Sequence, residues 1–321
     1  MSKGKVAVAV VHGIGKQEAN FADEVAERLH LLCLDDCGDG VRDEIVVRGV
    51  HWAQTLNTRQ DDLRERINVD DLRGPFNGLR DFLIHFAADA IAYNSSSSWV
   101  YARVHRVFAE TLSELRRLTT PDAPLFIISH SLGTVVASNY LWDLQQDYKA
   151  RQTPRDGIDQ RRVTDTVRAV RGERPSPLEE GRTLTMLYTL GSPIGLWSLK
   201  FFQDSQNKPI DVPRQPGEST HTGIQDWLFD AEDERLPRGW HNWYDREDII
   251  GYPLSGLNEA YDARVQDSVV NVGNILTSRT PMSHVNYFKD DDVIKPIARN
   301  LIKTWQAVED GGIRRANPAQ S

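Results

Sequence analysis

The sequence predicts an α/β fold in which a doubly wound, mostly parallel central sheet is covered by helices. Three observations predict it. Short apolar runs rich in β-branched residues recur along the chain, as is typical of strands buried on both faces of a sheet. Stretches with apolar residues at helical spacing separate these runs. Strands that alternate with helices in this way form βαβ units, which require a mostly parallel sheet.

The composition supports a globular protein and excludes several other classes. Of 321 residues, 40% are apolar and 26% are charged, a balance that allows a sizeable core. Lysine and arginine number 38 against 46 acidic residues, so the net charge is −8. A nucleic-acid partner is therefore not expected, because duplex binding needs clustered positive charge. Two cysteines, Cys33 and Cys37, rule out a disulfide scaffold and a four-thiolate zinc site.

The sequence carries no expected targeting or membrane segment. The apolar run at residues 6–11 is too short for the apolar core of a secretory signal, which needs ~7–15 residues. No run approaches the ~20 apolar residues that span a bilayer. These features predict a soluble, cytoplasmic protein whose two cysteines are thiols in a reducing compartment.

The first βαβ unit begins with a strand at residues 6–11. It ends in the segment 12–15, where two glycines allow a tight turn. Apolar spacing predicts a helix over residues 21–34, which the turn-rich segment 35–40 stops. Valine and isoleucine return at residues 44–52 and predict the second strand.

The alternation pauses over residues 53–98, which read as a helical insertion ending in a serine-rich loop. Residues 99–118 then predict a helix closed by Pro121 and Pro124. A strand at residues 125–128 follows. Its exit leads into a helix over residues 134–148.

The second half of the chain is more interrupted. Residues 150–182 are predicted to form a polar excursion. Residues 151–182 include eight arginines and six acidic residues, which indicates a solvated loop or, alternatively, a patch for an anionic ligand. A second insertion is predicted at residues 194–239, with an amphipathic piece at 196–202. The remaining elements are strands at 184–190, within 240–250 and at 268–272, and a closing helix at 292–307. We therefore predict one domain over residues 1–321.

Residues 129–133, Ser-His-Ser-Leu-Gly, carry the clearest chemical signal. Ser131 has a small residue two positions before it and a glycine two positions after it, between a predicted strand and a predicted helix. This arrangement describes a nucleophile elbow, in which a sharp turn exposes a serine hydroxyl beside a base. Ser129 stands where the usual pattern has glycine, so an ordinary strand-to-helix turn is the alternative.

With this motif and the His-Gly-Ile-Gly segment at 12–15, the chain resembles the α/β-hydrolase fold superfamily, particularly its lipase- and esterase-like members. The resemblance implies that the backbone N–H groups of Ile14 and Leu132 form an oxyanion hole. Two such donors stabilise the negative charge that develops on the substrate oxygen. His12 would then shape the loop rather than transfer a proton.

The resemblance also implies a Ser-Asp-His triad in that chain order. The segment 242–250 offers Asp245, Glu247 and Asp248. The family often places the acid before an apolar pair leading into a loop that contains proline, which favours Asp248. Asp245 is the alternative acid. If it has no catalytic role, we expect its carboxylate to cap a turn.

His284 is the one histidine that follows these acids in the sequence. It lies between the last predicted strand and the closing helix, where the family places its base. His284 would take the proton of Ser131, and the acid would fix its tautomer. The other histidines show no H-E-x-x-H motif or paired metal spacing. The acidic run 290–292 fits the start of a helix. Neither a metal nor a cofactor is expected.

Aromatic and aliphatic residues of the insertions are candidates for a substrate pocket or, alternatively, for packing the insertions onto the core. The set comprises Phe82, Ile84, Phe86, Ile91, Trp99, Trp197, Phe201 and Phe202, with His12 at the end of the first strand. The predicted function is a serine hydrolase that cleaves carboxylic esters of a small molecule or lipid through an acyl-enzyme on Ser131. The alternatives are a non-catalytic binding module of the same fold and an acyltransferase or thioesterase. Acyl chain length, ester against amide, and oligomeric state stay open.

Overall fold

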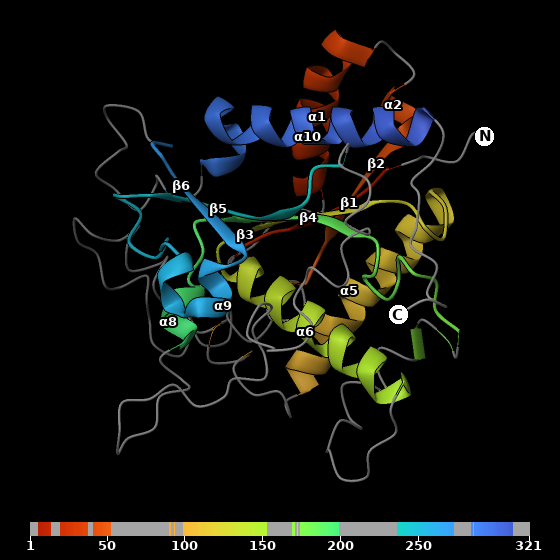
Figure 1. The fold of residues 1–321 in the computed structure, drawn as a ribbon, viewed down its shortest axis with the longest axis horizontal. Helices are drawn as coiled ribbons and strands as arrows, with labels where there is room; N and C mark the ends of the chain where they lie inside the picture. The colour runs from red at the N-terminus through yellow and green to blue at the C-terminus, as the bar shows by residue number, and fades with distance from the viewer. Residues whose placement is uncertain are drawn as a thin grey trace, which may run out of the picture.

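The computed structural model contains one sheet of six parallel strands, in the order β2-β1-β3-β4-β5-β6 (Figure 1). The strands are β1 (Val6–Val11), β2 (Ile45–Val50), β3 (Leu125–His130), β4 (Leu184–Leu190), β5 (Gly239–Asp245) and β6 (Val265–Val270). The structure describes residues 6–13, 20–37, 41–52, 90, 93, 99–152, 169–170, 172, 174–198, 236–272, 284 and 286–310.

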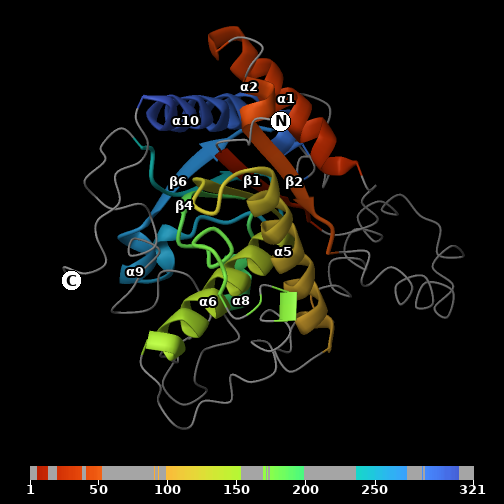
Figure 2. The ribbon, with the colours of Figure 1, turned by 90° about the vertical axis from the view of Figure 1, so that its right-hand side faces the viewer.

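Helices cover both faces of the sheet, which confirms the predicted α/β class. The helices are α1 (Phe21–Cys37), α2 (Val41–Glu44), α5 (Trp99–Leu118), α6 (Leu132–Gln152), α8 (Ile194–Ser198), α9 (Glu259–Asp262) and α10 (Asp291–Glu309). The described elements also include two short 3-10 turns, η5 (Ser255–Leu257) and η7 (Tyr287–Lys289). Figures 1 and 2 show α1 and α10 on one face and α5 and α6 on the other.

The side chains of β1 alternate between the two halves of the core. Val6, Val8 and Val10 pack with residues of α1 and α10. Ala7 and Ala9 point to the opposite face and pack with residues of α5 and α6. Because both faces of the strand are covered, all six of its residues are buried, which explains why the sequence shows a continuous apolar run there.

The strand order reverses beside β1, since the chain leaves β1 toward β2 and later returns to β3 on the other side. In open α/β sheets, such a switch point leaves a crevice at the carboxyl ends of the two strands, where ligands bind. His12 follows β1, and Ser131 follows β3. The fold therefore brings two sequence-predicted site segments to the same place.

Most boundaries lie close to the predicted ones, and β6 is the clearest correction. The strand spans Val265–Val270 rather than residues 268–272. Its centre is polar, and Asp267 accepts hydrogen bonds from the backbone N–H groups of Leu254 and Ser255 and from the amide of Asn242. These contacts hold a strand that its own hydropathy does not indicate.

The predicted insertions are described only in part. Residues 53–98 lie outside the described residues except for 90 and 93, and the segments 150–182 and 194–239 are covered at their ends. No helix in the described part of the chain is long and apolar enough to cross a membrane. Cys33 is buried in α1.

Candidate active site

Ser131 occupies the turn between β3 and α6 in a left-handed backbone conformation, with φ of 55°. It is the one non-glycine residue with positive φ among those the structure describes. This conformation is costly for a residue with a side chain, and such strain is found at functional sites when the surroundings enforce it. The turn thus differs from an ordinary strand-to-helix connection.

Hydrogen bonds from the exit of β4 hold this turn. The N–H of Ser131 donates to the carbonyl of Leu190 at 3.0 Å. The carbonyl of Ser131 accepts from the hydroxyl of Thr134 at 2.7 Å, and Thr134 Oγ1 lies 2.8 Å from Ser192 Oγ. Ser192 Oγ also accepts from the N–H of Ile194 at 3.3 Å. Both polar groups of the strained backbone are therefore satisfied, which keeps Ser131 in place.

The end of β1 packs tightly against the same turn. A Cβ atom on Gly133 would lie 2.2 Å from the carbonyl oxygen of His12, so only glycine fits there. A Cβ on Gly13 would lie 2.6 Å from Ser131 Cβ. Within the described part of the chain, Ser131 Oγ is buried and has no hydrogen-bond partner. The structure therefore shows no hydrogen bond between Ser131 Oγ and the ring of His284.

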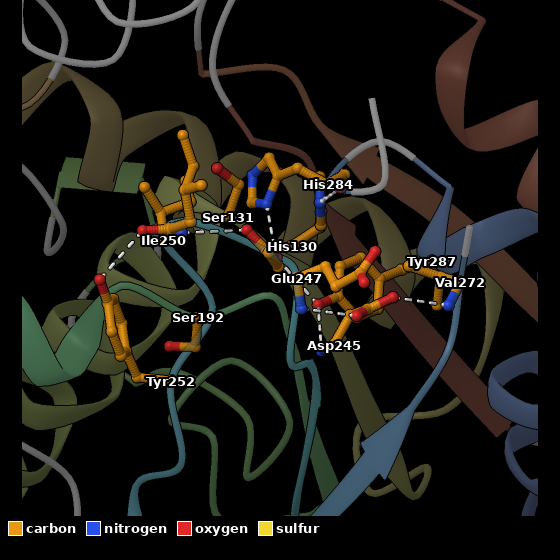
Figure 3. A network of polar contacts seen from close by, with 12 residues as sticks. His130, Ser131, Ser192, Asp245, Glu247, Ile250, Tyr252, Val272, His284 and Tyr287 are labelled. Carbon is orange, nitrogen blue, oxygen red and sulfur yellow. Dashed lines mark hydrogen bonds and ion pairs between the residues drawn. The ribbon is translucent and has the colours of Figure 1, made fainter. Parts of the chain in front are cut away.

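Asp248 and His284 form a buried pair in the loops that follow β5 and β6. His284 Nδ1 donates to Asp248 Oδ2 at 2.8 Å, and the N–H of Ile250 donates to Asp248 Oδ1 at 3.0 Å (Figure 3). Burial alone would raise the pKa of Asp248. The hydrogen bond and charge of His284 and the other donors outweigh burial, so the pKa lies below its usual value. An ionised Asp248 favours a histidine that is protonated on Nδ1.

Figure 3 shows the side chains of Ser131 and His284 next to one another. Gly191, which follows β4, lies against the side chains of Asp248 and His284. A Cβ on Gly191 would lie 2.7 Å from Asp248 Oδ2 and 3.1 Å from His284 Cε1. Its φ of 53° also favours glycine. The structure therefore brings Ser131, His284 and Asp248 together at the carboxyl edge of the sheet.

Asp245, the alternative acid, is used by the backbone instead. Its carboxylate accepts hydrogen bonds from the N–H of Glu247 at 2.8 Å and from the N–H of Val272 at 2.9 Å. These bonds fix the turn after β5 and the exit of β6. Asp245 therefore has the geometry of a turn-capping carboxylate, and the carboxylate bonded to His284 is that of Asp248.

Two buried histidines, His130 and His12, form hydrogen bonds to backbone carbonyls of the site segments. His130 Nε2 donates to the backbone carbonyl of His284 at 2.6 Å. His12 Nδ1 donates to the carbonyl of Gly13 at 2.7 Å, and its ring stacks on Trp52. Burial lowers the pKa of each to about 3. Both rings are therefore neutral near pH 7, and their hydrogen bonds position backbone rather than transfer protons.

Several predicted residues are not fully covered by the structure. Ile14, Phe201, Phe202 and the four pocket candidates between 82 and 91 lie outside the described residues. Trp197 belongs to α8, but its side chain is not among those described. Leu132 is the first residue of α6, so its N–H has no acceptor within the helix. That position suits an oxyanion donor.

The described residues contain no group of three histidine, cysteine or acidic side chains that could hold a metal ion. In the acidic run, Asp290 caps α10 by accepting from the N–H of Asp292 at 2.8 Å. This bond is the usual arrangement at a helix N-terminus.

The structure adds one functional candidate that the sequence did not single out. Tyr287 donates its hydroxyl to Asp248 Oδ2 at 2.9 Å. A tyrosine three residues after the predicted base was the available signal, because a single turn of helix or 3-10 helix returns the chain to the same side.

Comparison of the chain with models of known protein families found no match, and no curated protein matched it either. The interpretation of the site therefore rests on its own geometry and chemistry.

Proposed function

We propose that this protein is a serine hydrolase of the α/β-hydrolase fold that cleaves carboxylic esters through an acyl-enzyme on Ser131. The observation that carries the proposal is a strained, buried serine next to a histidine whose other ring nitrogen is held 2.8 Å from a carboxylate. Nucleophile, base and orienting acid in this relation are the defining parts of a serine triad.

The topology supports the same proposal. The order β2-β1-β3-β4-β5-β6 places the serine turn at the switch point of a parallel sheet. The triad members follow in the chain order serine, aspartate, histidine, which is the order of α/β-hydrolases. A serine on a strained turn between a strand and a helix is the nucleophile position of that fold.

In the proposed reaction, His284 accepts the proton of Ser131 as Oγ attacks the ester carbonyl. The N–H of Leu132, with that of Ile14 in the segment after β1, would stabilise the oxyanion, and each donor is worth roughly 3–4 kcal/mol where measured in other enzymes. His284 then gives the proton to the leaving alcohol. Water repeats these steps on the acyl-enzyme, releases the acid and restores the hydroxyl of Ser131.

Intact mass after incubation with a fluorophosphonate tests the proposal. Ser131 Oγ attacks phosphorus and fluoride leaves, so the native chain should gain one probe minus hydrogen fluoride. Ser131→Ala should gain nothing. Ser138→Ala is the matched control, because Ser138 is also a buried serine, located further along α6, and it should label like the native chain.

An aryl ester assay completes the test. The native chain should hydrolyse the ester, and Ser131→Ala should lose at least about 10³-fold in kcat. Native protein that takes no probe and turns over no ester would contradict the proposal and favour a binding module. Adding an alcohol acceptor distinguishes the classes of reaction, since transfer to the alcohol rather than to water would identify an acyltransferase.

A further inference from the structure

Tyr287 is buried at the start of η7, three residues after His284, and its hydroxyl joins two parts of the site. The hydroxyl donates to Asp248 Oδ2 at 2.9 Å. It also accepts the backbone N–H of Asp245 at 2.8 Å. Since Asp245 is the last residue of β5, the hydroxyl connects the end of a sheet strand to the carboxylate that contacts His284.

The carboxylate of Asp248 receives donors on both oxygens. Oδ1 accepts the N–H of Ile250, and Oδ2 accepts both Nδ1–H of His284 and the hydroxyl of Tyr287. The terminal torsion of an aspartate is broad, so an aspartate bonded only to His284 could rotate. The two further donors, one on each oxygen, fix the plane of the carboxylate with Oδ2 toward His284.

We infer that Tyr287 is a positioning residue of the proposed hydrolase, which holds Asp248 Oδ2 toward His284 and draws part of the negative charge from that oxygen. The inference rests on the proposed function for its effect on catalysis. Its effect on His284 can be measured without catalysis. Hydrogen bonds in such a chain polarise one another, so the donor on Oδ2 affects the proton that His284 holds.

Among the described residues, four ionisable side chains lie around the pair of Asp248 and His284. The ionisable side chains that face the pair are Tyr287 from η7, Asp245 from the end of β5 and His130 from the serine turn, with His12 beyond it at the end of β1. His130 and His12 are neutral across the range from pH 5 to 9, because burial lowers the pKa of each to about 3. The rings of His130 and His12 therefore do not change charge in this range and do not interfere with a measurement on His284.

Tyr287→Phe removes the hydroxyl and keeps the ring. With one donor fewer on Oδ2, more negative charge faces the imidazolium of His284, so His284 should lose its proton at higher pH. We expect the acidic limb of kcat/KM to move up by about 0.5 pH unit. We also expect kcat to fall about tenfold with KM unchanged, because the carboxylate gains rotational freedom.

Tyr188→Phe is the matched control. Tyr188 is a buried tyrosine of β4 whose hydroxyl accepts a hydrogen bond from Asn300 at 2.8 Å, so this variant also loses one buried hydroxyl contact. It should leave the pH profile at its native position. A second probe is 3-fluorotyrosine in place of Tyr287, which keeps both hydrogen bonds but makes the hydroxyl a stronger donor. It should move the limb to lower pH.

Nuclear magnetic resonance of the His284 imidazole against pH measures the same shift without turnover. A midpoint that rises in Tyr287→Phe, falls with 3-fluorotyrosine and stays constant in Tyr188→Phe supports the inference, even if the chain hydrolyses no ester and only the proposed function fails. A midpoint that does not respond to either change at Tyr287 overturns the inference, whatever the activity. Should Tyr287→Phe fail to fold, the fluorotyrosine result decides alone.

Discussion

The described part of the chain contains two histidine–aspartate pairs of the same composition in different surroundings. His284 contacts Asp248 at 2.8 Å beyond the strands, and His105 of α5 lies 3.2 Å from Asp143 of α6. Both histidines are buried, and in each pair the same aspartate oxygen accepts a tyrosine hydroxyl, from Tyr287 at 2.9 Å or from Tyr101 at 2.8 Å.

The two rings differ at both nitrogens. His284 Nδ1 is hydrogen-bonded to Asp248, whereas His105 Nδ1 makes no hydrogen bond within the described part of the chain. Nε2 of His105 is hydrogen-bonded to the hydroxyl of Tyr93 at 2.8 Å, and aromatic rings surround it, including those of Tyr101 and Tyr140. The ring of His284 instead lies next to Ser131 on a strained turn (Figure 3). An aspartate and a tyrosine around a histidine are therefore not enough to predict a reactive site. The proposed hydrolase activity depends on the serine that lies beside the ring of His284.

The largest expected effect separates the two histidines directly. His284→Ala should lower kcat for an aryl ester by about 10⁴-fold or more, because the proposed base is lost. His105→Ala should change kcat by less than about tenfold, while a cavity and unpaired neighbours lower the free energy of unfolding by roughly 2–4 kcal/mol. Ester turnover and urea unfolding of both variants measure the contrast. Equal losses of activity would contradict the distinction.

The two aspartates should separate almost as clearly. Asp248→Asn keeps the shape but favours the wrong tautomer of His284, and we expect kcat to fall about 10⁴-fold. Asp143 is 24% exposed, so Asp143→Asn should leave turnover close to native. The same assay measures both variants.

Asp245→Asn tests the alternative acid. It should reduce the free energy of unfolding by about 1–3 kcal/mol, since the carboxylate accepts two backbone N–H groups. A 10⁴-fold loss of turnover in this variant, with native-like turnover in Asp248→Asn, would instead make Asp245 the acid.

Glycine substitutions sharpen the comparison between strain and contact. Gly191 and Gly172 both have positive φ, 53° and 73°, but a Cβ on Gly191 would reach Asp248 and His284, whereas a Cβ on Gly172 would meet no described atom within 4 Å. Both alanine variants should lose about 1 kcal/mol of stability from backbone strain. Gly191→Ala should also lose about 10²-fold in kcat, because the pair is displaced. Similar kinetics for the two variants would argue against the pair being part of the site.

The last expected effect is on stability alone and concerns two buried histidines that are hydrogen-bonded to backbone carbonyls. His12 and His130 have pKa values lowered from 6.5 to about 3, so between these values the unfolded chain binds more protons than the folded one. Above pH 6.5 the two rings are neutral in both states and do not lower the free energy of unfolding. As the pH falls below 6.5, proton binding to the unfolded chain lowers the free energy of unfolding, by roughly 2 kcal/mol per histidine at pH 5.

Urea unfolding at pH 7.5 and pH 5 checks this sign. The difference between the two free energies should become smaller in His130→Gln, because that variant lacks one of the titrating rings. An unchanged difference would show that His130 does not bind its proton preferentially in the unfolded chain.

Where a strand is covered on both faces, the sequence alone predicted it closely. The apolar runs of β1 and β4 match their strands, because every residue in both is buried. The edge strand β6 was placed three residues too late, since its polar centre depends on contacts of Asp267 with segments distant in the sequence. A periodicity argument cannot include such partners.

The site shows the same division. Ser131 and His284 were proposed from a local motif and from chain order, and Asp248 from the resemblance to the family, with Asp245 as the alternative. The contribution of Tyr287 depends on the backbone N–H of Asp245, 42 positions earlier in the chain. The hydrogen bond from His130 to the carbonyl of His284 spans 154 positions. Ile14 and the pocket residues of the insertions remain predictions.

The left-handed conformation of Ser131 also affects how this protein would respond to selection. Glycine adopts φ of 55° without the steric penalty that a side chain brings. Ser131→Gly should therefore fold at least as stably as the native chain while lacking the hydroxyl. A population of variants screened only for heat resistance would drift toward glycine at this position, and a serine retained there would record selection for reactivity at the expense of stability.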